Sequence, residues 1–129
     1  MRFRRNRVMS VITAFTLAVL AVPAAFTASA DAAELAVFHS AHCPYCVAWE
    51  REIGRVYSTT EEGQAAPVRR LDIDARRLAE LSKIRDVDVT PTFVLVEQGH
   101  EVGRIVGYDG KKQFWADMRK LLARLHPQG

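Results

Sequence analysis

The sequence predicts an α/β fold with one four-stranded mixed sheet flanked by helices, in the order β-α-β-α-β-β-α. Three observations predict this fold. Short apolar runs alternate with stretches of helical periodicity along residues 34–125. A helical stretch separates the first two strands, which should therefore be parallel. A tight turn joins the last two strands, which should therefore be antiparallel.

The first strand is predicted over residues 34–39, where ELAVFH is a short apolar run. A helix is predicted from about residue 44 to about residue 59. Apolar residues recur in it at near-helical spacing, namely Val47, Ile53, Val56 and Tyr57, and Trp49 adds to the apolar surface. The segment EEGQAAP should then interrupt the chain at Gly63 and Pro67.

The middle of the chain is expected to hold a second strand and a second helix. Residues 68–73 read as the strand. Asp74 is placed to cap a helix over residues 75–84. Three apolar residues spaced three apart, Leu78, Leu81 and Ile84, should face the core.

The last part of the chain predicts a hairpin followed by a helix. Strands are expected over residues 92–96 and 101–106, and Gln98-Gly99-His100 should form the turn between them. Asp109 is placed to cap a helix over about residues 111–125. Its inward stripe would be Phe114, Met118, Leu121, Leu122 and Leu125.

Residues 1–30 have the organisation of a secretory signal peptide, which leaves residues 31–129 as a single domain. Four arginines and no acid precede an apolar run, and Ala28-Ser29-Ala30 fits the cleavage pattern, as does Ala30-Asp31-Ala32. The alternative is an uncleaved membrane anchor. The apolar run is about 15 residues long before Pro23, whereas a span requires about 20. We therefore expect export.

The positive charge of the chain is concentrated in this leader. The full chain carries 18 basic and 15 acidic residues, for a net charge of +3. Without the four leader arginines the balance is 14 against 15, or −1. The remaining domain has no basic excess of the kind that favours nucleic acid as a partner.

The only two cysteines of the chain, Cys43 and Cys46, indicate a reactive dithiol. Export places them where structural disulfides form, but a bridge across two intervening residues closes a loop too small to stabilise much. Pro44 suits a first helical turn, so Cys43 should lie at the helix N-terminus, where backbone amides favour its thiolate. Cys46, one turn later, should be more buried and should act as the resolving thiol.

Two other interpretations of the cysteine pair stay open. His39, His42, Cys43 and Cys46 offer nitrogen and sulfur ligands within eight residues, and Cu(I) suits two thiolates better than zinc does. No second ligand pair is found further along the chain, so we expect no metal. The other interpretation is a binding module with an inert disulfide. A protonated His42 would lower the pKa of Cys43, unless His42 is simply exposed.

The motif CPYC, followed about 45 residues later by Thr90-Pro91-Thr92-Phe93, resembles the thioredoxin fold over residues 34–126. CPYC itself resembles the glutaredoxin version of the motif. The resemblance implies that Pro91 follows a cis peptide bond and that Thr90 contacts the substrate backbone. It also places His42, Pro44 and Tyr45 around the reactive pair as supporting residues.

Two departures from the family pattern bear on mechanism. Thioredoxins carry a buried acid six residues before the first cysteine, where this chain has Val37. The usual proton acceptor for Cys46 is therefore missing. Gly107-Tyr108-Asp109 is similar to the turn with which glutaredoxins hold glutathione, so Gly107 and Asp109 are candidate glutathione ligands. Asp109 has the alternative role of a helix cap.

An exported domain of about 100 residues with CPYC and TPTF resembles the SoxS group of periplasmic thiol-disulfide oxidoreductases. That resemblance implies a periplasmic reductase that keeps the cysteine of the SoxYZ sulfur carrier reduced, with electrons from a membrane thiol transporter. No cofactor is expected beyond the redox-active pair Cys43–Cys46. The alternatives are a glutathione-dependent reductase and a periplasmic copper-delivery protein.

Overall fold

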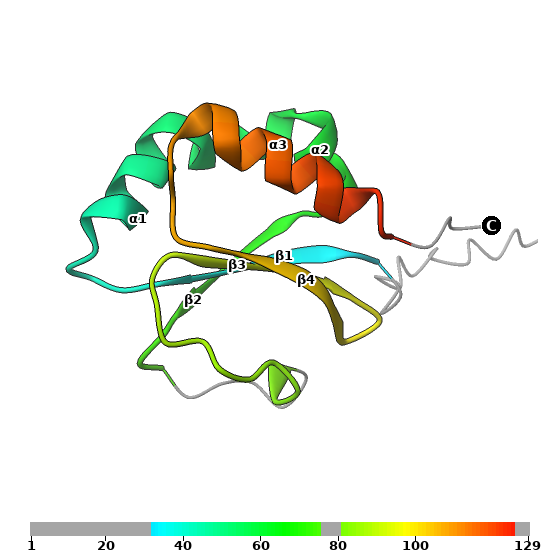
Figure 1. The fold of residues 1–129 in the computed structure, drawn as a ribbon, viewed down its shortest axis with the longest axis horizontal. Helices are drawn as coiled ribbons and strands as arrows, with labels where there is room; N and C mark the ends of the chain where they lie inside the picture. The colour runs from blue at the N-terminus through cyan, green and yellow to red at the C-terminus, as the bar shows by residue number, and fades with distance from the viewer. Residues whose placement is uncertain (1–31, 76–80, 126–129) are drawn as a thin grey trace, which may run out of the picture.

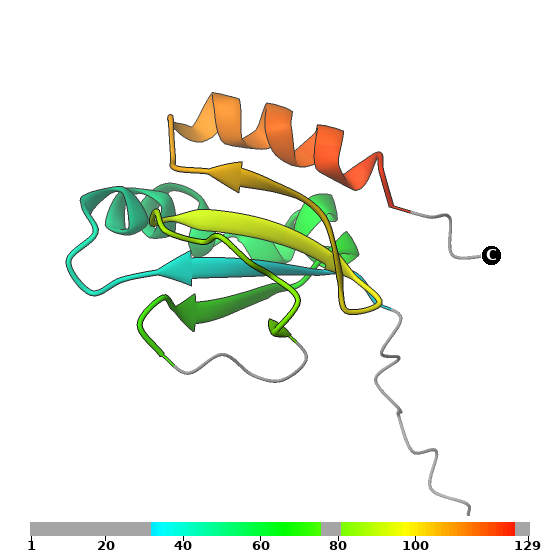
Figure 2. The same ribbon diagram turned by 60° about the horizontal axis from the view of Figure 1, so that its bottom comes forward.

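The computed structural model of the protein describes residues 32–75 and 81–125. A four-stranded sheet carries the helices on one face, and the segment after residue 81 covers the other (Figures 1 and 2). The predicted signal peptide lies outside the described residues. Within the described ranges, no helix has the length and apolar character needed to cross a membrane.

The elements follow the predicted order with some additions. The strands are β1 (Glu34–His39), β2 (Val68–Asp72), β3 (Thr92–Glu97) and β4 (His100–Val106). The helices are α1 (Pro44–Trp49), the π-helix η1 (Glu50–Gly54), the 3-10 helix η2 (Tyr57–Thr59), α2 (Glu61–Ala65) and α3 (Lys111–Leu122).

The strand order in the sheet is β2-β1-β3-β4, with β1 and β2 parallel and the other pairs antiparallel. This confirms the predicted mixed sheet. Phe38, near the end of β1, lies opposite Thr92, the first residue of β3. The loop that follows β1 and the loop that precedes β3 therefore meet at the same end of the sheet.

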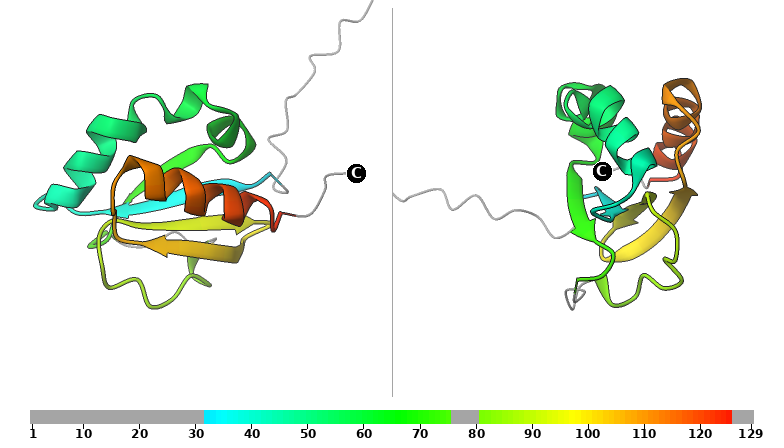
Figure 3. Two further views of the ribbon diagram at one scale, coloured as in Figure 1. Left: turned by 45° about the horizontal axis from the view of Figure 1, so that its top comes forward. Right: turned by 90° about the vertical axis from the view of Figure 1, so that its left-hand side faces the viewer.

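The two central strands are buried on both faces because each face has its own core. Leu35 and Val37 of β1 point toward the helices, into a core that also holds aromatic residues of α1 and α3. Ala36 and Phe38 point the other way, into a smaller core with Leu81 and Ile84. Figure 3 shows α1 and α3 side by side on the same face of the sheet.

The predicted turn between the last two strands is confirmed. Gln98 and Gly99 have φ values of 52° and 73°. Two successive residues with positive φ match the tight turn that suits the twist of an antiparallel hairpin.

The helix predicted over residues 44–59 is not one regular α-helix, and two of its apolar residues were placed wrongly. Val47 is 63% exposed and Val56 is 48% exposed. The buried residues are instead Trp49, Ile53 and Tyr57, which are spaced four apart. The π-helical segment has hydrogen bonds that reach five residues, so its turns are wider and residues four apart stay on one face.

Gly63 was expected to interrupt the chain, but it lies inside α2. The hydroxyl of Thr60 accepts a hydrogen bond from the Gly63 N–H at 3.0 Å and so caps this helix. A Cβ at position 63 would overlap the backbone carbonyl oxygen of Tyr57. The glycine therefore permits a close contact between α2 and η2.

Of the two predicted aspartate caps, one is wrong, and the other, Asp74, stays a prediction because residues 76–80 lie outside the described residues. The residue at the start of α3 is Gly110, with φ 96°, and no side chain caps that helix, so Asp109 is not its cap. At the end of β2, the carboxylate of Asp72 accepts the N–H of Asp74 at 2.9 Å. Half of the helix predicted over residues 75–84 lies outside the described residues; residues 81–84 form no α-helix, although Leu81 and Ile84 are buried as predicted.

Candidate active site

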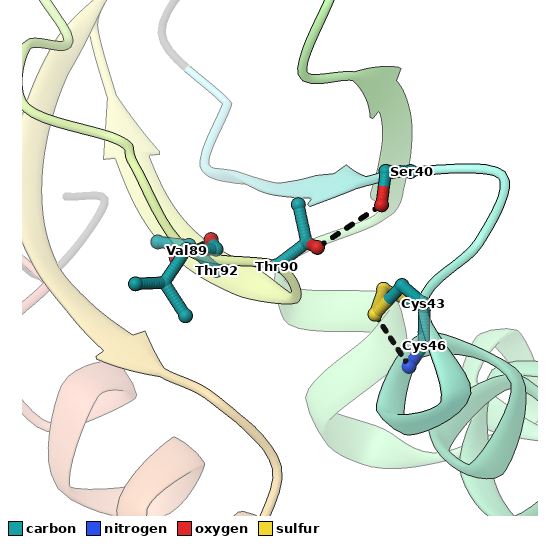
Figure 4. The surroundings of a disulfide bond; sticks show 6 residues. All are labelled: Ser40, Cys43, Cys46, Val89, Thr90 and Thr92. Carbon is teal, nitrogen blue, oxygen red and sulfur yellow. Dashed lines mark hydrogen bonds between the residues drawn. A yellow bond between two sulfur atoms is a disulfide. The ribbon is translucent and has the colours of Figure 1, made fainter.

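Cys43 and Cys46 form a disulfide at the junction of β1 and α1, with their Cα atoms 5.2 Å apart (Figure 4). Cys43 is the N-cap of α1, with extended backbone angles, and Pro44 takes the first helical position. The Sγ atom of Cys43 accepts the backbone N–H of Cys46 at 3.0 Å. This N–H is one of those that a helix start leaves without an intrahelical partner, and it favours negative charge on the sulfur.

The relative burial of the two cysteines differs from the prediction. Cys43 is only 6% exposed, whereas Cys46 is half-buried. The side chain of Cys43 points back over the first turn of α1, where its sulfur caps the helix. Cys46 lies on a face of α1 that lines an open cavity, described below.

The second loop at the site carries Thr90 and Pro91, which are joined by a cis peptide bond. The hydroxyls of Thr90 and Ser40 are 3.2 Å apart and hydrogen-bonded, although the two residues are 50 positions apart in the sequence (Figure 4). Ser40 lies between β1 and the cysteines. This bond ties the loop before Pro91 to the loop before Cys43.

Two further hydrogen bonds, both made by residues in the C-terminal half of the chain, hold the segment around Pro91. The Thr92 hydroxyl donates to the carbonyl oxygen of Val89 at 2.6 Å. The N–H of Gly107 donates to the carbonyl oxygen of Pro91 at 2.8 Å. The predicted glutathione residue Gly107 therefore lies against the cis-proline.

Arg104 on β4 binds the first residues of this loop. Its guanidinium donates to the backbone carbonyl oxygens of Asp86, at 3.0 Å, and Arg85, at 2.9 Å. Both carboxylate oxygens of Glu101 accept from the same guanidinium at 2.6 Å, and this pairing raises the pKa of Arg104. The guanidinium therefore joins residues 85–86 to the sheet.

A cavity of ≈ 380 Å³ lies beside Cys46. Its lining residues come from β1, the two loops, the helical segment and β2: Val37, His39, Ser40, Cys46, Val47, Trp49, Glu50, Arg70 and Pro91. Val37 is buried and contributes no titratable group. Position 37 therefore supplies no proton acceptor to the cavity beside the second cysteine.

The charged part of this cavity is an ion pair between Glu50 and Arg70. The Arg70 guanidinium donates to both carboxylate oxygens of Glu50, at 3.0 Å and 2.9 Å, and to the carbonyl oxygen of Gly54 at 3.3 Å. It also lies 5.9 Å from the ring centroid of Trp49. Gly54 makes this possible, because a Cβ there would lie 2.5 Å from the Glu50 carboxylate.

Sequence reasoning missed Ser40, Glu50, Arg70 and Arg104 as site residues. A signal existed for Glu50, which follows Cys46 by four residues and so shares its helix face. Contacts between distant segments place the other three, and a sequence pattern does not reveal them.

The remaining predicted site residues surround the disulfide on the surface. His42, Pro44 and Tyr45 are exposed. Asp109 is exposed too, and with Gly107 it lines a separate cavity of ≈ 150 Å³. Within residues 32–75 and 81–125, no group of three or more His, Cys, Asp or Glu residues is arranged to hold a metal ion.

Large exposed apolar side chains are found next to both loops of the site. They are Tyr45 and Val47 beside the cysteines, Val89 beside Thr90, and Val106, which lies opposite Thr92 in the sheet. Exposed apolar groups gathered at one place on a small domain are typical of a surface that contacts another protein.

Comparison with known proteins identifies the family. A model of the thioredoxin-like domain matches residues 25–122. The chain belongs to the thioredoxin-like family. Together with the disulfide-bonded CXXC pair, membership of this family indicates thiol-disulfide oxidoreductase activity.

Among solved structures, the chain is similar to the reduced form of the periplasmic thioredoxin SoxS from Paracoccus pantotrophus. The two are 39% identical, with a TM-score of 0.69, over 71% of this chain and 97% of that one. A thioredoxin from Thermus thermophilus is 29% identical, with a TM-score of 0.55, over 69% of this chain and 72% of that one.

A match to a curated thioredoxin covers only part of the chain. Over 47 residues the chain is 47% identical to thioredoxin H2-1 from rice, Oryza sativa subsp. japonica. This match covers 36% of the chain and 34% of the rice protein, so it spans about a third of that relative.

Proposed function

We propose that the protein is a periplasmic thiol-disulfide reductase that acts on protein disulfides through Cys43 as nucleophile and Cys46 as resolving thiol. The observation that carries the proposal is the hydrogen bond from the Cys46 N–H to the Sγ of Cys43 at the start of α1. In the reduced protein the same amide stabilises a thiolate, which is the attacking form of cysteine.

The proposed reaction proceeds in two exchanges. The thiolate of Cys43 attacks a substrate disulfide, bonds to one substrate sulfur and releases the other as a thiolate. Cys46, after losing its proton, attacks the Sγ of Cys43 and displaces the remaining substrate sulfur. Two electrons pass to the substrate, and the protein is left with the Cys43–Cys46 disulfide that the structure contains.

A protein is the substrate class that the surface supports best. Exposed apolar side chains lie next to each of the two loops that meet at the disulfide, whereas charged side chains would suit a small anionic thiol better. Thr90 lies in the loop beside the disulfide and is hydrogen-bonded to Ser40. An extended substrate segment would lie along this loop.

The similarity to SoxS supports a narrower version of this proposal. The SoxYZ sulfur carrier would be the protein substrate, and a membrane thiol transporter would re-reduce the disulfide. The leader at residues 1–30 supports the periplasmic location, because its basic, apolar and small-residue regions follow each other as in secretory signals.

Trapping of the mixed disulfide tests the roles of the two cysteines and identifies the substrate. A Cys46→Ser variant should retain partner proteins as disulfide adducts on Cys43, because no second thiol releases them. A Cys43→Ser variant should retain none. Mass spectrometry identifies the trapped protein, and equal trapping by both variants would contradict the assignment.

Glutathione is a second candidate electron donor. The hydrogen bond between Gly107 and Pro91 brings the turn of Gly107 and Asp109 next to the cis-proline loop, which favours this candidate. Reduced glutathione should then reduce the Cys43–Cys46 disulfide, and Asp109→Asn should slow that reduction several-fold. An unchanged rate in the variant would exclude Asp109 from a glutathione site.

A further inference from the structure

We infer that His39 accepts the thiol proton of Cys46 during release of the substrate, which gives a catalytic role to a residue at the end of β1. The inference rests on the proposed dithiol mechanism. That mechanism requires Cys46 to lose a proton before it attacks, because the thiol itself is a poor nucleophile. Val37, at the position where the family carries an acid, has no group that accepts one.

The geometry of β1 brings His39 to the second cysteine. Side chains two residues apart on a strand point to the same face, so His39 points to the helix-bearing face of the sheet, as Val37 does. His39 is closer to the cysteines along the chain. Both residues line the ≈ 380 Å³ cavity that Cys46 also lines.

The environment leaves the imidazole of His39 available for a proton. The residue is half-buried, and its ring has no hydrogen-bond partner among the described residues. Histidine is the side chain best suited to exchange protons near neutral pH. The cavity has room for water, so the transfer can be direct or through one water molecule.

The other titratable group of this cavity is Glu50, and it is the weaker candidate. Both of its carboxylate oxygens already accept hydrogen bonds from Arg70. The neighbour of His39 on β2 is Asp72, which lies opposite it in the parallel ladder. Glu50, Arg70 and Asp72 are therefore the charged groups that face His39 from the helical segment and from β2.

The proposed step balances as follows. The S–H bond of Cys46 breaks and its proton passes to a neutral ring nitrogen of His39, which becomes an imidazolium. The Cys46 thiolate forms a bond with the Sγ of Cys43. The bond between Cys43 and the substrate sulfur breaks, and that sulfur leaves with the electron pair and takes up a proton. His39 then returns its proton to solvent.

Stopped-flow reaction of the reduced protein with excess 5,5′-dithiobis(2-nitrobenzoic acid) separates the two thiols. Attack by Cys43 releases a first coloured thiolate, and attack by Cys46 on the adduct releases a second. At pH 7 we expect His39→Gln to slow the second phase at least about tenfold, because general bases typically contribute about 100-fold or more. The first phase should stay within about twofold.

The pH profile distinguishes a proton acceptor from a structural role. In the natural protein the second phase should level off once the acceptor is neutral. In His39→Gln it should keep rising toward the ordinary pKa of a cysteine thiol, about 8.5. Imidazole added to His39→Ala should restore part of the lost rate, because the enlarged cavity admits it.

Controls separate this inference from the proposed function. Cys46→Ser should release one coloured thiolate per protein, and release of two would contradict the dithiol mechanism itself. His100→Gln, at an exposed hairpin position, should leave both phases unchanged. The inference is overturned if His39→Gln leaves the second phase unchanged, if it slows both phases equally, or if only Glu50→Gln slows the second phase.

Discussion

Two loops meet at the disulfide, and they are built in different ways. The cysteine loop, residues 40–46, owes its geometry to its own sequence: Pro44 starts the helix and Cys43 caps it through a bond to Cys46. The proline loop, residues 85–92, is held mainly by other parts of the chain, because Arg104 and Gly107 on or after β4 bind its carbonyl oxygens.

The difference separates reactivity from recognition. A locally built cysteine loop keeps its thiolate-stabilising amide even when distant contacts change. A loop that depends on distant contacts shifts when those contacts are removed, and Thr90 with it. Substitutions at the supports of the proline loop should therefore affect substrate binding and stability, while the reactivity of Cys43 stays the same.

The largest effect should come from Thr92→Val, which removes the hydroxyl that donates to the Val89 carbonyl. Thr92 is buried and its bond to Val89 is half-buried, so water replaces the lost hydroxyl only in part. We expect the free energy of unfolding to fall by about 1–2 kcal/mol, as measured by urea denaturation. Thr59→Val is the matched control, because its hydroxyl makes a similar bond to Val56 in an exposed position. An equally large fall in the free energy of unfolding of Thr59→Val would show that the burial of Thr92 does not matter.

The next effect should come from Arg104→Gln, which removes the guanidinium that fastens Arg85 and Asp86. We expect KM for a protein disulfide to rise about fivefold, since a hydrogen bond to a charged group contributes about 1.5 kcal/mol or more. The alkylation rate of Cys43 should stay within about twofold. Arg119→Gln, at an exposed arginine 3.8 Å from Glu62, is the control. If the alkylation rate of Cys43 fell by the same factor as KM rises, the proline loop would affect reactivity as well as substrate binding, and the proposed difference between the loops would be wrong.

A smaller effect is expected from Val47→Ser and Val89→Ser, which remove exposed apolar side chains next to the cysteine loop and the proline loop. Each should raise KM for a protein substrate about threefold through lost apolar contact. Neither should change stability by more than about 0.5 kcal/mol. Val56→Ser is the matched control, because Val56 is exposed but lies beyond the π-helical segment, away from the cysteines. An equal rise in KM in that control would place substrate contact elsewhere.

The smallest effect should come from Tyr108→Phe, which changes how stability depends on pH. The Tyr108 hydroxyl donates to Glu52 at 2.7 Å, and this bond is the main cause of the lowered pKa of that carboxyl. Because the pKa of Glu52 is lowered in the folded state, its ionised carboxyl stabilises the fold at pH values above the ordinary glutamate pKa of about 4.3. This stabilisation is lost as the pH falls through the lowered pKa. In Tyr108→Phe the fall in urea midpoint below pH 4.5 should be shallower. An unchanged slope would assign the lowered pKa to Arg51 instead.

The sequence was informative wherever a short stretch carries its own structure. The ends of the four predicted strands agree with the structure to within one residue, because short apolar runs and turn residues such as Gly99 are local signals. The cysteine loop was also predicted, since Pro44 and the cysteine spacing suffice for it. The cis bond at Pro91 was implied by a resemblance, because few X–Pro bonds are cis in general.

The sequence was less informative where the structure depends on a change of helix type or on distant partners. Val47 is exposed because it lies two residues from buried Trp49 in α1 and so on another helix face, whereas Val56 follows the π-helical segment, which shifts the buried face. Arg70 and Arg104 read as ordinary surface charges until the fold brings them to Glu50 and to the proline loop.

The pairing of Phe38 with Thr92 has a consequence for folding. A slip of the β1–β3 ladder by two residues would keep every side chain on its own face, yet it would carry the two loops about 7 Å past each other. A chain with this shifted register would still give the circular dichroism spectrum of a folded protein, but it would lose the hydrogen bond between Ser40 and Thr90. The rate at which the protein reduces a protein disulfide therefore reports whether β1 and β3 are paired in the correct register.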